Sequence, residues 1–186
     1  MKTILYSFVL VLFLAVTACN NGTDKKDSDA LTQNNAGKDK FTDTEQGFRI
    51  KFPGNPTKNT ETVTIEGMGD ELITDFTYSA NAVIYTVAVS PQSTTNVKGD
   101  ADMTELLISL KDSFCADLQL QVSQEKETRL DGNAGIFFKA NSSKYYTAVA
   151  NYIVNGKLYQ VAIITSKGEI PQATIDAFIG SFEILK

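Results

Sequence analysis

Histidine and tryptophan are absent from this 186-residue chain, and only four prolines and two cysteines are present. Without histidine, the chain lacks both the usual general base near neutral pH and the commonest metal ligand. It has no serine nucleophile with a histidine to activate it, no convincing pair of catalytic carboxylates, and no glycine-rich loop that leads into a helix in the phosphate-binding pattern. The sequence therefore predicts a protein that is not an enzyme and that uses no cofactor and no metal.

Clusters of basic residues are also missing. The net charge is −5, whereas nucleic-acid binders need a basic face that replaces counterions, so we expect no nucleic-acid partner. Hydrophobic residues make up 42% and charged residues 21% of the chain, which is typical of a globular protein. The length suits one ordinary domain with appendages.

The first 18 residues have the pattern of a secretory signal peptide. Lys2 provides the positive start, residues 4–16 form an apolar run, and small residues follow at 17–18. The apolar run has about 13 residues, whereas a membrane-spanning helix needs roughly 20. We therefore predict a signal peptide at 1–18, with a permanent transmembrane anchor as the alternative.

The order Val16-Thr17-Ala18-Cys19 resembles the lipobox of bacterial lipoproteins. This resemblance implies cleavage before Cys19, attachment of diacylglyceryl to its sulfur, and acylation, for example with palmitate, of the new amino terminus. Such an anchor has two or three chains and holds a protein at a membrane far better than a single chain does. Asn20, rather than Asp, favours the outer membrane, so we expect a lipid-anchored protein of the cell envelope that faces the periplasm or the surface.

Residues 20–40 contain one large apolar residue, Leu31. A segment with so little to bury cannot offset the entropy lost on ordering, so residues 19–40 are expected to form the lipidated start and a flexible tether. An export signal or a partner-binding tail is the alternative. Residues 41–186 then form the folded domain.

The centre of that domain is a predicted hairpin formed by residues 145–165. Asn155-Gly156 separates two apolar, β-branched runs, and this pair favours a type I′ turn that places Val154 opposite Lys157. One face then carries Tyr146, Ala148, Ala150, Tyr152, Tyr159, Val161 and Ile163, and the other carries Val149, Ile153, Leu158, Ala162 and Ile164. Because both faces are mainly apolar, the hairpin should lie in the middle of a sheet that is covered on both sides.

The other elements follow from alternation and helical spacing. Asp102 is expected to cap the longer helix, and the first four strands are expected to form an antiparallel meander. The helix is expected to pack through one apolar stripe at helical spacing, formed by Met103, Leu106, Leu107, Leu110, Phe114 and Leu118. The further strands are expected at 47–52, 61–66, 72–79, 82–90, 122–129, 135–140 and 182–184, and the helices at 102–119 and 171–180. The predicted fold class is α+β, a largely antiparallel sheet with helices on both faces in a three-layer α/β/α sandwich.

Four stretches resemble bacterial PsbP-like or Mog1-like α/β/α domains. They are residues 47–56, 130–135, 155–159 and 178–184, and the resemblance covers most of residues 45–186. Relatives that it implies include photosystem accessory proteins, a Ran-binding factor and many uncharacterised lipoproteins, so the resemblance implies a fold but transfers no function. The metal sites of plant members contain histidine, which this chain lacks, and they cannot be carried over.

Two groups of residues could have a chemical role, but a structural role explains each of them. Cys115, the one cysteine left after lipidation of Cys19, has no histidine to activate it and is expected to be a buried, inert thiol. Asp100, Asp102 and Glu105 could supply oxygens to Ca²⁺, but a dedicated loop has six or more ligands, and the start of a helix explains the same residues.

Asn151 and Gln160 face each other across the central hairpin among apolar neighbours. Buried amides must find partners, so they either bond to each other or line a polar pocket. If a ligand site exists, we expect it over this face with Tyr145 at its rim.

The sequence thus predicts a membrane-anchored lipoprotein with a non-catalytic binding role, as an accessory or assembly factor for an envelope protein. A carrier of a small apolar or amphipathic ligand and an envelope hydrolase are the alternatives. The oligomeric state is not predicted.

Overall fold

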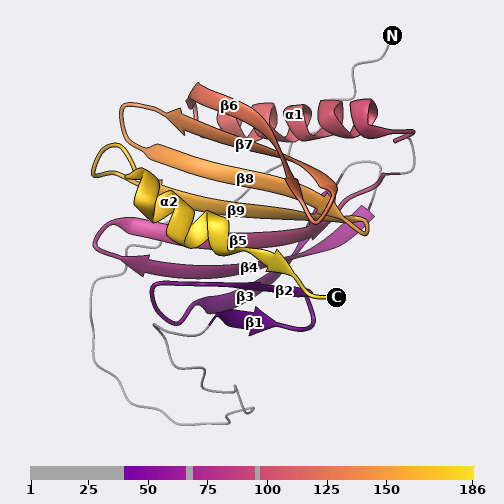
Figure 1. Ribbon diagram of the computed structural model, residues 1–186, viewed down its shortest axis with the longest axis horizontal. Coiled ribbons are helices and arrows are strands. Elements are labelled where there is room, and N and C mark those ends of the chain that lie inside the picture. Colours follow the sequence, from indigo (N-terminus) through magenta and orange to yellow (C-terminus); the bar gives the residue numbers. More distant parts are fainter. Residues whose placement is uncertain (1–39, 66–68, 95–96) are drawn as a thin grey trace.

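The computed structural model describes residues 40–65, 69–94 and 97–186, so Cys19 and the signal peptide lie outside the described residues. In this part of the chain, seven strands form a main antiparallel sheet in the order β3-β4-β5-β9-β8-β7-β6 (Figure 1). Three short strands form a second sheet in the order β1-β2-β10. The elements are β1 (Phe41–Asp43), β2 (Phe48–Ile50), β3 (Thr57–Ile65), β4 (Gly69–Ala80), β5 (Val83–Pro91), α1 (Asp100–Asp117), β6 (Gln121–Leu130), β7 (Asn133–Asn141), β8 (Tyr146–Val154), β9 (Lys157–Thr165), α2 (Gln172–Phe178), η1 (Ile179–Ser181) and β10 (Glu183–Ile184).

The predicted central hairpin is confirmed as β8 and β9. Asn155 and Gly156 have positive φ angles of 51° and 74°, as a type I′ turn requires, and Val154 pairs with Lys157. β7 and β5 flank the hairpin. Its two apolar faces enter different core clusters, because Val161 packs toward the second sheet and Ala162 packs on the opposite side with Phe114 of α1.

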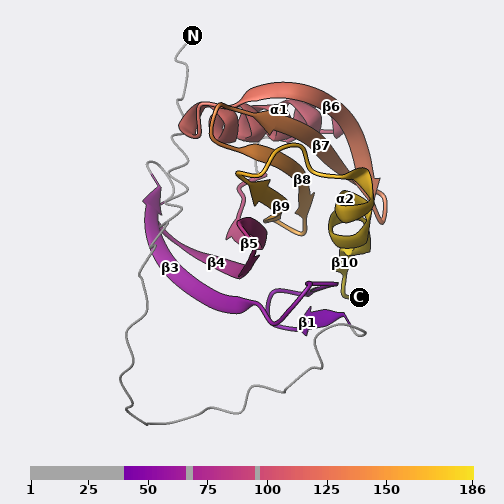
Figure 2. The same cartoon turned by 90° about the vertical axis from the view of Figure 1, so that its left-hand side faces the viewer.

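The two faces of the main sheet are covered unequally. α1 lies on one face, where it contacts β7 most, and β8 and β6 less. The short α2, η1 and the β1-β2-β10 sheet lie on the other face (Figure 2). The α+β class and the largely antiparallel sheet are therefore confirmed, while the second cover combines one seven-residue helix with strands.

The predicted four-stranded meander is wrong, because its first strand belongs to the other sheet. β2 pairs with β1, a strand that the sequence analysis missed, and with β10 from the end of the chain. Phe48 and Ile50 of β2 are both fully buried, and their alternation is the same whichever sheet they join. The meander therefore contains only β3, β4 and β5.

The predicted helix cap is also wrong. α1 begins at Asp100 with Gly99 in the capping position and no side-chain cap, and Asp102 lies within the first turn. The Asp102 carboxylate instead accepts a hydrogen bond from the backbone N–H of Lys98 at 2.8 Å. The apolar stripe is confirmed, since Leu107, Leu110 and Phe114 are buried against the sheet.

The turn between β4 and β5 places an alanine in an unfavourable conformation. Asn81 and Ala82 have φ angles of 52° and 60°, and a left-handed conformation is strained for a residue with a Cβ atom. We expect Ala82→Gly to raise the free energy of unfolding by about 0.5–1 kcal/mol, measured by urea denaturation. Ala80→Gly, in the adjoining strand, is the control and should lower it; equal effects of the two changes would contradict the expectation.

Candidate ligand-binding site

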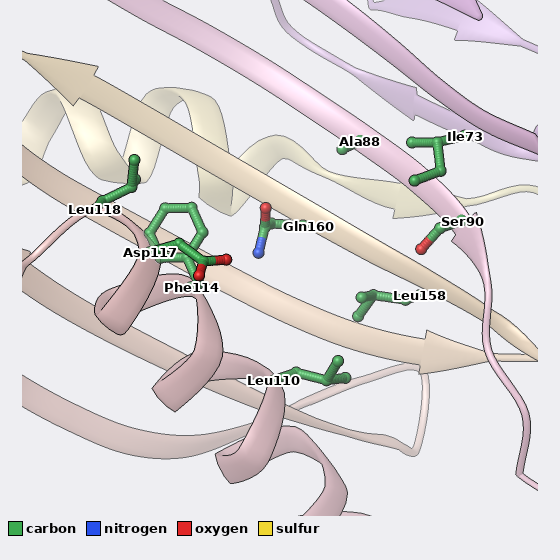
Figure 3. A pocket seen from close by; sticks show the side chains of 9 residues that line it. All are labelled: Ile73, Ala88, Ser90, Leu110, Phe114, Asp117, Leu118, Leu158 and Gln160. Carbon is green, nitrogen blue, oxygen red and sulfur yellow. The ribbon is translucent and has the colours of Figure 1, made fainter. Parts of the chain in front are cut away.

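A pocket lies between α1 and the strands β4, β5 and β9 (Figure 3). Most of its wall is apolar, and Ser90, Asp117 and Gln160 are the polar residues that line it. The lining residues are Ile73, Ala88, Ser90, Leu110, Phe114, Asp117, Leu118, Leu158 and Gln160. The enclosed space measures about 20 Å³, enough for one water molecule, within a hollow of about 490 Å³ that includes its mouth open to solvent.

Two ion pairs link α1 to β6, on the flank of the helix that faces away from this pocket. Lys111 Nζ lies 2.5 Å from Glu125 of β6, and Arg129 of β6 lies 2.7 Å from Asp100 at the helix start. Burial alone would lower the pKa of Lys111, but hydrogen bonds to Glu125 and Asp112 outweigh it, and the pKa is raised. Lys111 is therefore charged, and the two ion pairs link one flank of α1 to β6, while its other flank forms a wall of the pocket.

Asn151 and Gln160 are directly opposite each other in the β8–β9 register, as predicted. Gln160 is half-buried and lines the pocket. Asn151 is fully buried, and within the described ranges neither Nδ2 nor Oδ1 has a hydrogen-bond partner, so the two amides are not bonded to each other. An unpaired buried amide is unfavourable by about 1–3 kcal/mol, so Asn151 is expected to lower the stability of the native protein.

Tyr145 does not line the pocket that Gln160 lines. It lies at a second, more polar hollow of about 1120 Å³, a volume that again includes the mouth open to solvent, formed by the end of α1 and the loop between β7 and β8. A backbone hydrogen bond of 2.8 Å from Ser142 N–H to the Tyr145 carbonyl closes that loop. The two hollows share Asp117 and Leu118, so Tyr145 and Gln160 lie at neighbouring sites, while Asn151 lines neither.

Cys115 is buried on the sheet side of α1, in the cluster that contains Phe114 and Phe138. Burial raises the pKa of its thiol to about 11, and the positive charge of Lys111 offsets this only in part. The thiolate is the reactive form, so the structure supports the inert thiol expected from the sequence.

Thiol labelling provides a test of this assignment. At pH 8 we expect Cys115 in the folded protein to react at least about a hundredfold more slowly than in the chain unfolded in guanidinium, because both burial and the raised pKa suppress the thiolate. The unfolded chain is the control, and equal rates in the two states would show that Cys115 is open to solvent.

The acidic residues at the start of α1 have partners within the protein. Asp100 accepts a hydrogen bond from Arg129 at 2.7 Å, Asp102 accepts one from Lys98 N–H, and Glu105 is exposed. In the ranges that the structure describes, no group of three or more Asp, Glu or Cys residues lies close enough to hold a metal ion. The hydrogen bonds of Asp100 and Asp102 therefore give both carboxylates a structural role at the start of α1.

The pocket itself was not predicted from the sequence. Its wall combines Ile73, Ala88, Leu110 and Leu158, which come from four elements and look like ordinary core residues in the sequence. The one feature of the sequence that indicated a site was the pair of amides, Asn151 and Gln160, in an apolar hairpin. Of these two residues, only Gln160 lines the pocket.

Comparison with known proteins identifies the fold. The domain matches the solution structure of cyanobacterial PsbP (CyanoP) from Synechocystis sp. PCC 6803, with a TM-score of 0.56 and 14% sequence identity over 84% of this chain and 98% of that chain. This fold is PsbP-like. The match to a protein of unknown function, PA94 from Pseudomonas aeruginosa, has a TM-score of 0.38 and 12% identity over 66% of this chain and 87% of that chain. No family model matches the chain, and no curated protein matches it.

At this level of identity, the PsbP-like domain shares a fold with CyanoP and inherits no function from it. Across the described residues, no helix is both long and apolar enough to cross a membrane.

Proposed function

We propose that this protein is a lipid-anchored lipoprotein of the cell envelope whose PsbP-like domain acts by binding, as an accessory or assembly factor for an envelope protein. The observation that carries the proposal is the order Val16-Thr17-Ala18-Cys19 behind a short apolar run. It supports lipidation at Cys19, and Asn20 in place of Asp favours a position at the outer membrane, facing the periplasm or the surface. Residues 20–39 then separate the anchor from Lys40, where the described domain begins.

We further assign the domain to the three-layer α/β/α class of PsbP-like and Mog1-like domains. Support comes from α1 on one face of the main sheet and from α2 with the small sheet on the other. Because a fold does not determine a function, the assignment is compatible with a non-catalytic role.

Cell fractionation tests the anchor. Cys19→Ala should move the protein from the membrane to the soluble fraction and abolish incorporation of a labelled fatty acid, because residue 19 provides the sulfur that is acylated. Cys115→Ala, which removes the buried cysteine, is the matched control and should stay in the membrane. A Cys19→Ala protein that remains membrane-bound would contradict lipidation as the anchor.

Affinity purification from solubilised membranes tests the binding role. We expect a defined envelope protein to co-purify with the native chain in a constant ratio. The absence of any such protein, together with turnover of a substrate by the purified chain, would favour an enzyme instead.

A second candidate function is a carrier of a small apolar or amphipathic ligand. The observation that favours it is the apolar pocket under α1, with Gln160 in its wall. The enclosed 20 Å³ requires α1 to move outward before a larger molecule can enter.

Native mass spectrometry distinguishes this candidate. A carrier should retain a small molecule on purification, and Ala88→Phe, which places a ring in the pocket, should remove it. Thr86→Phe changes the next residue on the same face of β5, outside the pocket lining, and serves as the control. Loss of the molecule in both variants, or in neither, would contradict this assignment of the pocket.

A further inference from the structure

The two margins of the main sheet differ in how open they are. β3 forms one margin and β6 the other. β3 pairs with β4 along all nine residues, from Thr57↔Thr77 to Ile65↔Gly69, without a shift of register. Side chains 57–62 are all exposed. A regular strand at a margin has backbone N–H and C=O groups on its outer side that another strand can pair with.

β6 has features that block such pairing. Its register with β7 shifts between Val122 and Gln124, which marks a bulge. Four of the five residues at 125–129 are charged, and two of them, Glu125 and Arg129, bind side chains of α1. Bulges and charges are the usual protection of an edge strand.

β3 lacks this protection. Lys58 and Glu61 are the charged residues of the strand, and four of its nine residues are threonines, which favour extended structure. The Lys58 ammonium lies 2.6 Å from Glu45, 3.4 Å from Asp43 and 5.5 Å from the centre of the Phe76 ring. The one positive charge of the strand is therefore neutralised within its own domain.

We infer that β3 pairs with β3 of a second copy of this chain, antiparallel, so that the two main sheets form one continuous sheet. The strand is complementary to itself when the two-fold axis passes through Thr60. In that register Thr60 faces Thr60, Asn59 faces Glu61 and Lys58 faces Thr62, so no like charges meet. A shift of the axis to Glu61 would place two carboxylates opposite each other, which is unfavourable.

The start of the domain lies on one side of the main sheet, which suits two copies anchored in one membrane. This point rests on the proposed function. A two-fold axis perpendicular to the sheet keeps equivalent faces of both copies on the same side. β1, which follows Lys40, belongs to the small sheet on the α2 face (Figure 2). Lys40, the first described residue, pairs with Glu183 of β10, so in both copies it would lie on that side of the joined sheet.

Cross-linking of the full-length protein in isolated membranes tests the pairing. Thr60→Cys places the two new thiols opposite each other, at a Cα separation of about 4.5–5.5 Å in either type of antiparallel pair. Cys115 is buried and Cys19 carries lipid in the proposal, so the new thiol is the accessible one. The control is Ser123→Cys, at an exposed position of the opposite margin β6.

With a short bismaleimide, we expect a Thr60→Cys dimer at least about tenfold more abundant than the Ser123→Cys dimer, because pairing holds the thiols at high effective concentration. Equal yields of the Thr60→Cys and Ser123→Cys dimers would show that the cross-links come from random collision. If Thr60→Cys gives only monomer, the pairing is excluded. A Thr60→Cys adduct with a different protein would show that a foreign strand, not a second copy, occupies the margin. Each of these three outcomes overturns the inference.

A second measurement uses charge. Thr60→Lys places two ammonium groups opposite each other across the two-fold axis, so the solubilised protein should change from dimer to monomer in sedimentation. Ser123→Lys should leave it unchanged. Circular dichroism identifies any variant that does not fold, and a dimer that persists in folded Thr60→Lys would contradict the pairing.

The failure of this inference and the failure of the proposed function are separable. If the native protein is found in the soluble fraction, the anchor is wrong, and the same cross-linking in that fraction still decides whether β3 pairs with β3.

Discussion

Replacing Phe48 by alanine is expected to lower the free energy of unfolding by about 3–5 kcal/mol, the range for loss of a buried phenylalanine. Phe48 is fully buried between the two sheets. The centre of its ring lies 5.0 Å from Phe76 of the main sheet, 5.7 Å from Phe182 and 6.2 Å from Phe41 of β1. Its removal would leave a cavity where the small sheet meets the main sheet, and the neighbouring rings cannot all collapse into it.

Urea denaturation, followed by far-ultraviolet circular dichroism, measures this effect. The matched control is Leu72→Ala, because Leu72 is 52% exposed and also apolar, and its loss should change stability by less than about 0.5 kcal/mol. A Phe48→Ala protein as stable as the Leu72→Ala protein would show that the small sheet does not pack on the main sheet as described.

Asn151→Leu is expected to have the opposite effect and to raise the free energy of unfolding by about 1–3 kcal/mol. Leucine has the same branching and the same number of side-chain heavy atoms as asparagine, but it has no polar atoms to desolvate. Both polar atoms of the Asn151 side chain are buried without partners among the described residues. Its neighbours on this face, Val149 and Ile153, are buried and apolar, so leucine suits the site.

Gln160→Leu is the comparison for this prediction, since Gln160 lies opposite Asn151 but is half-buried and can reach water in the pocket. We expect it to change stability by less than about 0.5 kcal/mol. If Asn151→Leu instead destabilises the native protein, the prediction is wrong, because the amide then has a partner that leucine cannot replace or the site does not accept leucine.

The elements that were predicted well are those whose signal is local. The Asn155-Gly156 turn sets the register of β8 and β9, because few other residues tolerate two successive positive φ angles. The stripe on α1 was predicted because helical spacing alone determines which side chains share a face. Neither signal depends on which distant segment packs against it.

The errors arose where distant segments decide the structure. Phe48 and Ile50 alternate as any half-buried strand does, and that pattern says nothing about whether β3 or β10 will be the neighbour. β1 was missed because three residues beside a polar segment give too short a pattern. The cap of α1 was misplaced because Asp102 suits a capping position and also the first turn, and the chain that precedes it makes the choice.

The candidate site divides in the same way. The sequence placed Asn151 opposite Gln160, but it could not show that Gln160 reaches a pocket while Asn151 stays sealed beneath apolar neighbours. Tyr145 was expected at the rim of this site and instead lies at the adjoining hollow, because the loop closed by Ser142 directs it there.

By itself, the sequence determined the α+β class, the central hairpin with its two apolar faces, and the buried stripe of the long helix, because these follow from turn chemistry and from the periods of strand and helix. The tertiary structure alone decided that β2 leaves the main sheet, that α1 covers only part of one face, and that β3 is the end strand of the main sheet among the described residues. The physical reason is that packing partners are chosen by the total area that all segments can bury together, and no local pattern contains that sum.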